Sequence, residues 1–176
     1  MLLDLSSVPV IETERLRLRL PRADDLDRFA EMYGDPEVMR YVGTGQTGTR
    51  EDAWRGIAMM LGQWVMRGYG MYAVEDRSGR LLGRAGLIHP EGWPGLEIGW
   101  TFIRDSWGRG YATEAAKAAL EDAFGRLRVQ RLISLIHPEN RASIRVAEKL
   151  GERFQSMISF KGMQVGLHAI DNPRQG

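Results

Sequence analysis

The sequence lacks cysteine altogether and holds only three histidines. Without cysteine, a disulfide, a cysteine nucleophile and a thiolate metal site are excluded, and a reducing compartment is permitted. His89, His137 and His168 lie far apart and lack the four-residue spacing by which two histidines on one helix bind zinc. Each is therefore expected in a loop or in the core, and we predict no metal site.

A marked excess of one charge and a long hydrophobic run are also missing. Lys and Arg number 24 and Asp and Glu 23, giving a formal net charge of +1, so neither nucleic acid nor a membrane surface is expected as the main partner. Residues 1–20 carry acidic side chains where a signal peptide is basic, and their apolar runs are too short to cross a bilayer. We therefore expect a cytoplasmic protein.

What the chain does have is enough apolar material for one core. It contains 176 residues, of which 43% are hydrophobic, and this predicts a single domain over residues 1–176. The composition is compatible with a monomer and with a homodimer.

The first part of the chain predicts one strand. Leucine and arginine alternate over residues 13–20, as in a half-buried strand with Arg15, Arg17 and Arg19 on its outer face.

Two helices are expected next, over residues 23–41 with a break near residues 34–36, and over residues 50–66. Tryptophan and methionine side chains of the second helix are interpreted mainly as core. The alternative is that some of them line an adaptable pocket: Trp54, Met60 or Trp64.

After Gly70 the pattern changes to short strands, the first three of which predict an antiparallel meander. Gly151 is well placed to end the last helix, and Lys161-Gly162 predicts a hairpin turn. The expected elements are strands over 71–75, 81–89 and 96–103, a helix over 112–127, a strand over 131–136, a helix over 140–150, and a hairpin of 153–160 with 163–170.

The segment WGRGYATEAA, residues 107–116, predicts an anion site. Gly108 and Gly110 allow backbone N–H groups to point into a concavity, and the helix that begins near Tyr111 adds its unsatisfied N–H groups and the positive end of its dipole. Arg109 adds a cation, and a second helix start at Asn140 follows one strand later. The alternative, that the glycines merely end a strand and cap a helix, is less favoured because these features occur together.

The segment GTGQTG, residues 43–48, also matches a glycine-rich fingerprint, that of dinucleotide-binding proteins. A helical segment precedes it instead of a strand, and no βαβ unit surrounds it, so nicotinamide or flavin binding is rejected. A flexible loop is the preferred interpretation.

The order of elements, with the glycine turn opening the third helix, resembles the GNAT superfamily of N-acetyltransferases. Within it, TERLRLR, EIGW, WGRGYATEA and NRASIRVAEKLG are similar to the RimJ/RimL-type branch. The resemblance implies an α/β (α+β) fold, with a mixed, mostly antiparallel sheet of six to seven strands flanked by about four helices. It also implies an enzyme that moves the acetyl group of acetyl-CoA to a primary amine, on a protein N-terminus or on a small molecule.

The resemblance implies cofactor contacts as well. The turn signature falls on Trp107, Gly110 and Ala112, with Trp107 at the position where the general form has Gln or Arg. The strand over 96–103 would offer backbone groups to the pantetheine arm and diverge from strand 131–136, and Asn140 would close the other side or act only as an N-cap. The expected cofactor-binding residues are Phe102, Ile103, Trp107, Gly108, Arg109, Gly110, Tyr111, Ala112, Thr113, Asn140 and Ser143.

Amine acetylation needs a base for the amine and a proton for the leaving thiolate. Alternation places Glu97 on one strand face with Gly99 and Thr101, so Glu97 is the candidate base, with a solvated strand glutamate as the alternative. Many relatives carry a tyrosine where this chain has Ala147, so Ser143 is the candidate acid, or only a second capping group. The rival to an enzyme is a non-catalytic acyl-CoA-binding sensor.

Overall fold

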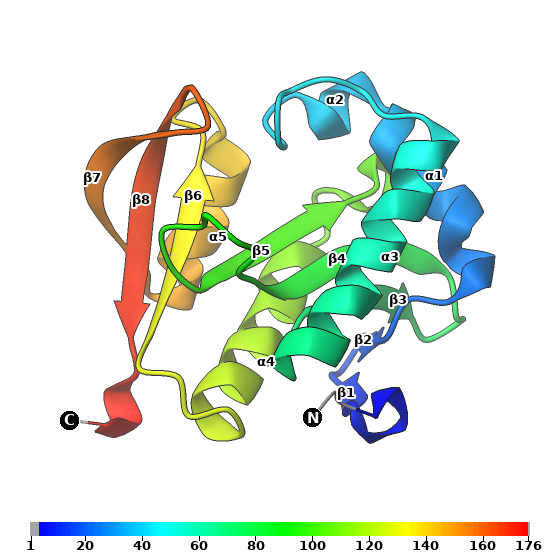
Figure 1. Cartoon of the computed structure of the whole chain (residues 1–176), viewed down its shortest axis with the longest axis horizontal. Helices are drawn as coiled ribbons and strands as arrows, with labels where there is room; N and C mark the ends of the chain where they lie inside the picture. The colour runs from blue at the N-terminus through cyan, green and yellow to red at the C-terminus, as the bar shows by residue number, and fades with distance from the viewer. Residues whose placement is uncertain (1–3, 176) are drawn as a thin grey trace.

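The computed structural model describes residues 4–175 of the chain; residues 1–3 and 176, which belong to the predicted domain, lie outside this range. One eight-stranded sheet forms its centre (Figure 1). The strands are β1 (Ile11–Glu12), β2 (Leu16–Arg19), β3 (Met71–Asp76), β4 (Leu81–Ile88), β5 (Glu97–Phe102), β6 (Arg131–Ile136), β7 (Arg153–Phe160) and β8 (Met163–Asp171). The α-helices are α1 (Leu26–Gly34), α2 (Pro36–Met39), α3 (Arg50–Arg67), α4 (Tyr111–Gly125) and α5 (Arg141–Leu150).

The sheet order is β1-β2-β3-β4-β5-β6-β8-β7, and every neighbouring pair is antiparallel except β5 and β6. The predicted mixed, mostly antiparallel fold is therefore confirmed. The sequence predicts six to seven strands and about four helices. The additional strand is β1, a two-residue segment paired to β2, and the additional helix is the single turn α2.

Helices cover both faces of the sheet (Figure 1). Four alanines of α4 are buried, and their small side chains let the helix lie close to the strands: Ala115, Ala116, Ala119 and Ala123. On the other face, α1 and α3 pack with β3 around Phe29, Met60 and Met71.

Local sequence signals set the helix ends. Helix α3 begins with a capping box between Thr49 and Asp52, and Asn140 caps α5 by accepting a bond from the Ser143 N–H at 3.1 Å. Gly68 and Gly151 end these two helices in the left-handed conformation, as the sequence predicts for Gly151. No helix within residues 4–175 combines the length and apolarity needed to cross a membrane.

Two side-chain predictions were wrong. Arg19, expected on an outer face, is only 4% exposed, because the start of α1 covers this part of β2 and supplies Asp25 as a partner. Trp54, expected in the core or a pocket, is 59% exposed, whereas Met60 and Trp64 are buried in the core. The apolar stripe of α3 is therefore narrower than its sequence indicates.

Candidate active site

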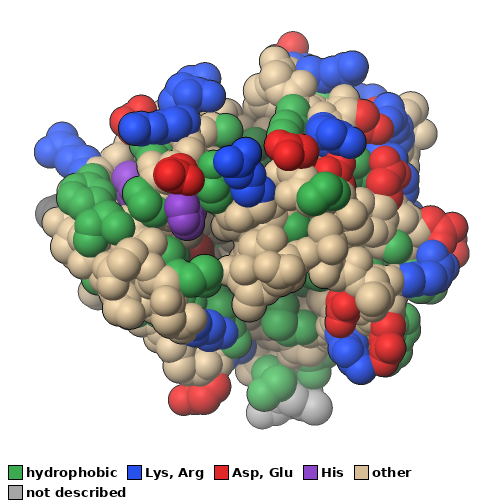
Figure 2. Space-filling model, turned by 90° about the horizontal axis from the view of Figure 1, so that it is seen from above, with side chains coloured by type: hydrophobic (Ala, Val, Ile, Leu, Met, Phe, Trp, Pro, Cys, Tyr) green, Lys and Arg blue, Asp and Glu red, His purple; other side chains and the backbone are tan. Residues whose placement is uncertain are grey.

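The structure contains a cavity of about 1010 Å³. Its lining comes from the turn before α4, the start of α5, strand β5 and the segment that follows α2. The face seen in Figure 2 is hollowed, with histidine side chains at the rim. His137 lines the cavity and stacks on Tyr41, with ring centroids 4.9 Å apart.

The cavity exists because β5 and β6 stop pairing. Their parallel ladder contains one Cα pair, Glu97 with Ile133, beside which the Ile133 N–H donates to the Leu96 carbonyl. The next rung of a parallel ladder would run from the Leu135 N–H to the Ile98 carbonyl. Instead, the Leu135 N–H donates to Glu97 Oε1 at 3.2 Å.

The Ile98 carbonyl in turn accepts from the hydroxyl of Ser134, at 2.7 Å. Two side chains therefore take the place of one backbone rung, and the strands diverge beyond them. The divergence expected between these two strands is present.

Glu97 is half-buried at this junction, and its Oε2 accepts from the indole N–H of Trp93 at 2.5 Å. Burial raises the pKa of Glu97 to about 7, although the bonds from Trp93 and Leu135 and the charge of Arg84 lower it. The alternative of an ordinary solvated glutamate is not favoured by this environment.

The space beside Glu97 is open. A Cβ atom added at Gly99, two residues along the same strand face, would meet nothing within 4 Å. The room that the sequence predicts next to this carboxylate therefore exists.

The turn before α4 has the geometry of an anion site. Gly108 and Gly110 have φ angles of 75° and 78°, which favour glycine, and a Cβ on Gly108 would meet nothing within 4 Å. The first helical bond of α4 runs from the Glu114 N–H to the Gly110 carbonyl, so the amides of the preceding residues have no partner within the helix. Trp107, Gly108, Gly110, Tyr111, Ala112 and Thr113 all line the cavity.

Arg15 holds this turn in place, a role that sequence reasoning missed. Its guanidinium donates to the Arg109 carbonyl at 2.9 Å, pairs with Glu114 at 2.6 Å, and lies 4.8 Å from the ring centroid of Tyr111. Its place in an alternating strand pattern predicts only an exposed charge, so the long-range contact leaves no local signal.

Two predicted cofactor contacts lie elsewhere. Ile103 is buried in the core. Its N–H donates to the Leu82 carbonyl and its carbonyl accepts from the Ser106 N–H, so both of its backbone groups already have partners within the fold. Arg109 is exposed and is not among the residues that line the cavity. Phe102 does line the cavity, and its carbonyl accepts from the indole N–H of Trp107 at 2.8 Å.

Asn140 and Ser143 both line the cavity at the start of α5. Asn140 is the N-cap, as one of its two predicted roles requires. Ala147 has no exposed surface, so that position of α5 contributes to packing and presents no group to the cavity.

Sequence reasoning also missed three further residues of the site. Trp93 bonds to Glu97, and Lys161 lies 4.2 Å from the Trp93 ring centroid. Arg84 donates to the Tyr33 hydroxyl at 3.1 Å across the cavity floor. Trp93 and Lys161 lie in turns, where the sequence has no periodic pattern. Arg84 lies in β4, a strand that is predicted from its apolar residues, and this pattern assigns no role to an arginine.

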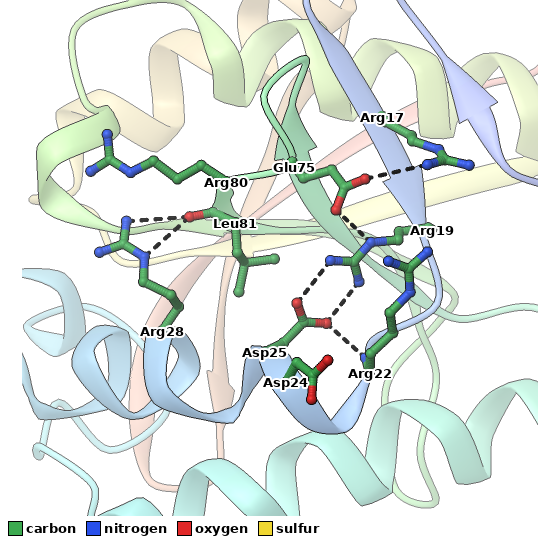
Figure 3. A pocket seen from close by; sticks show the side chains of 10 residues that line it. Arg17, Arg19, Arg22, Asp24, Asp25, Arg28, Glu75, Arg80 and Leu81 are labelled. Atoms are coloured by element: carbon green, nitrogen blue, oxygen red, sulfur yellow. Dashed lines mark hydrogen bonds and ion pairs between the residues drawn. The ribbon is translucent and has the colours of Figure 1, made fainter.

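A second pocket, of about 520 Å³, lies near the edge of the sheet and is built around Arg19 (Figure 3). The buried guanidinium pairs with Glu75 at 2.6 Å and with Asp25 at 2.7 Å, and Asp25 also accepts from the Arg22 N–H. Burial lowers the pKa of Arg19, but the bonds to Asp25 and Glu75 outweigh it and raise that pKa overall. These contacts connect β2, β3 and the start of α1, so we interpret the cluster as structural.

Comparison with known proteins identifies the family. The model of the acetyltransferase (GNAT) domain matches residues 15–153. The chain is 36% identical over 152 residues to the uncharacterized protein YkkB of Bacillus subtilis, with 83% of this chain and 86% of that protein covered. It also matches the crystal structure of an acetyltransferase from Agrobacterium tumefaciens with a TM-score of 0.84 and 28% identity, covering 93% of this chain and 95% of that one.

A more distant structure, RimL, an α-N-protein acetyltransferase in complex with coenzyme A, has a TM-score of 0.76 at 16% identity, with 93% of this chain and 98% of that one covered. It shows a shared fold. The family model and the 36% identical relative show more: this chain belongs to the GNAT acetyltransferase family and is an acyltransferase.

Proposed function

We propose that the protein transfers the acetyl group of acetyl-CoA to a primary amine by direct attack in a ternary complex. The observation that carries this proposal is the continuous cavity, which joins the glycine turn before α4 to the carboxyl group of Glu97. An anion site and a weakly acidic carboxyl group that line the same cavity are what a phosphate-bearing acyl donor and an amine acceptor require.

The residues present fit coenzyme A. Gly108 and Gly110 leave the cradle free of side chains, and the amides at the start of α4 are available for a pyrophosphate. Beyond Glu97, β5 has no further backbone pairing with β6, so this edge can bond amide groups of a pantetheine arm, apart from the Ile98 and Phe102 carbonyls, which accept from Ser134 and Trp107. When bound, acetyl-CoA would supply an activated carbonyl and a thiolate leaving group.

Glu97 is the proposed general base. A carboxyl group with a pKa of about 7 is partly ionised at neutral pH and is basic enough to accept a proton from an attacking amine, directly or through water. Trp93 holds one carboxylate oxygen and the Leu135 N–H holds the other, which fixes the orientation of the group.

Ser143 is proposed to bind the cofactor near the leaving sulfur. Its N–H is used by the Asn140 cap, whereas its hydroxyl has no partner among the described residues and lies beside the cavity. It can therefore donate a hydrogen bond to a sulfur atom without breaking a contact of the fold.

The acceptor is proposed to be a protein N-terminus or a small amine, as in the RimJ/RimL-type branch that the sequence resembles. It would enter beside α2 and the following segment, where Tyr41, Val42 and Gly43 line the cavity. Assignment to that branch, a cytoplasmic location and the choice between monomer and homodimer stay predictions.

The test is release of free CoA from saturating acetyl-CoA in the presence of a panel of N-terminal peptides, amino acids, polyamines and aminoglycosides. We expect amine-dependent CoA release with matching acetylated product. Saturable acetyl-CoA binding with no release for any amine would instead support the rival proposal, a non-catalytic acyl-CoA sensor. Absence of binding would overturn both.

A further inference from the structure

A second buried carboxyl group, Glu152, lies behind the junction of β5 and β6. It follows Gly151 at the end of α5, is 4% exposed, and its Oε1 lies 2.9 Å from the hydroxyl oxygen of Ser134. Its Oε2 has no hydrogen-bond partner among residues 4–175. A buried carboxylate anion with a bare oxygen is unfavourable, so the surroundings favour the neutral acid.

The hydrogen count at Ser134 leads to the same conclusion independently. Its hydroxyl oxygen lies 2.7 Å from the Ile98 carbonyl, which can only accept, and 2.9 Å from Glu152. One hydroxyl hydrogen cannot satisfy both contacts. Both are satisfied if the hydroxyl donates to Ile98 and a protonated Glu152 donates to Ser134.

Neighbouring charges support a neutral Glu152. Burial, together with the negative charge of Glu97, raises its pKa to about 8, although the hydrogen bond with Ser134 lowers it. His168 is paired across the sheet with Ser134, and burial lowers its pKa, so it brings no positive charge at neutral pH. The exposed Glu148 of α5 adds only negative charge, and no Lys or Arg within the described residues forms an ion pair with Glu152.

We propose that Ser134 and Glu152 form a proton relay that protonates the departing CoA thiolate. This inference rests on the proposed acetyl transfer. As the C–N bond forms and the C–S bond breaks, the amine proton passes to Glu97, and the sulfur takes the hydroxyl proton of Ser134. Ser134 takes the carboxyl proton of Glu152.

The relay conserves protons and charge. Before transfer Glu97 carries the negative charge and Glu152 the proton; after transfer these states are exchanged, and exchange with solvent restores them. The site therefore never holds two buried negative carboxylates at once.

The position of Ser134 suits this step better than that of Ser143. Ser134 is among the residues that line the cavity where β5 and β6 part, but it is only 2% exposed. Its hydroxyl, bonded to the Ile98 carbonyl, has to turn from that oxygen to the sulfur to give up its proton. A lone hydroxyl is a very weak acid, and Ser143 has no proton source behind it, whereas Ser134 has Glu152. Ser134 would be a catalytic residue, and Glu152, which acts through it, a positioning residue and proton store.

The first test needs no acceptor. The full-length protein labelled with ¹³C at the glutamate carboxyl carbon is titrated by NMR, with Glu152→Gln and Glu97→Gln identifying the two resonances. We expect Glu152 to be protonated at neutral pH and to titrate above Glu97. An ionised Glu152 at neutral pH would overturn the relay whether or not the protein acetylates amines.

The second test is kinetic and uses Glu152→Gln, Glu152→Ala and Ser134→Ala. Glutamine retains an N–H donor to Ser134 but cannot transfer a proton, so it separates a relay from a structural contact. We expect acetyl-CoA affinity to be retained in Glu152→Gln and kcat at saturating amine to fall at least about tenfold. We expect wild-type kcat to decline above about pH 8, as Glu152 ionises, and this decline to be absent in Glu152→Gln.

Glu148→Gln, which removes an exposed carboxylate of the same helix, is the matched control and should leave kcat and its pH dependence unchanged. Wild-type kinetics in Glu152→Gln, with loss only in Glu152→Ala, would show a structural contact and overturn the relay. A wild-type protein that binds acetyl-CoA but acetylates nothing would overturn the proposed function, a result distinct from either outcome.

Discussion

Ionisable side chains are buried both at the edge of the sheet and at the junction of β5 with β6, but the surroundings of these side chains differ. Arg19 is 4% exposed and lies between two carboxylates, Asp25 and Glu75, at 2.7 and 2.6 Å. Glu97 and Glu152 lie among neutral donors and form no ion pair within the described residues. Their pKa values rise to about 7 and about 8, whereas that of Arg19 moves further from neutrality.

This difference in partners determines what each cluster can do. Paired ions keep their charge over the whole working range of pH, so the Arg19 cluster can join elements but cannot exchange protons. Unpaired buried carboxyl groups change protonation state near neutrality, which is useful to a reaction that moves protons. Stability should therefore depend on the first cluster and turnover on the second.

The largest expected effect follows removal of Arg19. Arg19→Ala leaves Asp25 and Glu75 buried without their cation, and we expect a loss of about 3–5 kcal/mol in the free energy of unfolding. Urea denaturation measures it. Arg17→Ala, which removes an arginine with a 43% exposed side chain from the same strand, is the control and should cost no more than about 1 kcal/mol. Equal losses in the two variants would show that burial of the Arg19 cluster is energetically unimportant.

Glu97→Gln tests the carboxyl groups at the junction of β5 and β6, on which turnover should depend. Glutamine has nearly the same shape but cannot accept the amine proton, so kcat should fall about 100-fold or more. Its NH2 group cannot accept from Trp93 or Leu135, so we expect a loss of about 1–2 kcal/mol in the free energy of unfolding, smaller than that of Arg19→Ala. Because Glu97 must be ionised to act, wild-type kcat should rise with pH through about 7, and the variant should lack this rise. An unchanged rate and pH profile of amine-dependent CoA release would exclude Glu97 as the base.

Gly110→Asp tests the proposed pyrophosphate site at the glycine turn before α4. An anion next to the pyrophosphate site should weaken acetyl-CoA binding about 30-fold, or about 2 kcal/mol. The measurement is the rise in Tm on addition of acetyl-CoA. Gly79→Asp is the control, because Gly79 has a φ of 84°, close to the 78° of Gly110. A Cβ on Gly79 would meet nothing within 4 Å, and one on Gly110 would be in ordinary contact with the Arg15 guanidinium at 3.5 Å. Unimpaired binding in Gly110→Asp would place the phosphates elsewhere.

The stability of the wild type should fall as the buried carboxyl groups ionise. A folded-state pKa of about 8 for Glu152, against an ordinary value of 4.5, means that the folded protein binds the proton more tightly. Unfolding free energy should therefore decrease as pH rises from about 5 to about 8, and Glu152→Gln should remove the part of that decrease that comes from Glu152. Urea midpoints across this range measure it, and parallel curves would contradict a buried neutral Glu152.

Ser143→Ala has the smallest expected effect. Loss of one hydrogen bond to the leaving sulfur should lower kcat about threefold to tenfold and leave stability unchanged, because the Asn140 cap uses the backbone of Ser143 and not its hydroxyl. A loss of stability without a change in kcat would assign Ser143 to capping alone.

Much of the fold could be predicted from the sequence because its signals are local. Helix α4 follows the glycine turn, Asn140 caps α5, and Gly151 ends it in the left-handed conformation. Burial of Arg19 could not be predicted, because alternation in β2 gives the two faces of the strand but not what covers them.

The residues of the site also divide into those that the sequence predicts and those that it does not. Glu97 and the turn over residues 107–113 could be predicted from residue type and order, whereas Arg15 and Glu152 reach the site through contacts between distant segments. The separations are 94 residues between Arg15 and Arg109, and 18 between Ser134 and Glu152. Spacing along the chain does not encode such contacts.

Calorimetric titration of the wild-type protein with acetyl-CoA tests the role of the cavity most directly. If the cavity between the glycine turn and Glu97 is the acyl-donor site, the titration shows saturable heat with one molecule bound per chain. A folded protein that gives no saturable heat would contradict the assignment of this cavity, together with the proposed roles of Glu97, Ser134 and Glu152.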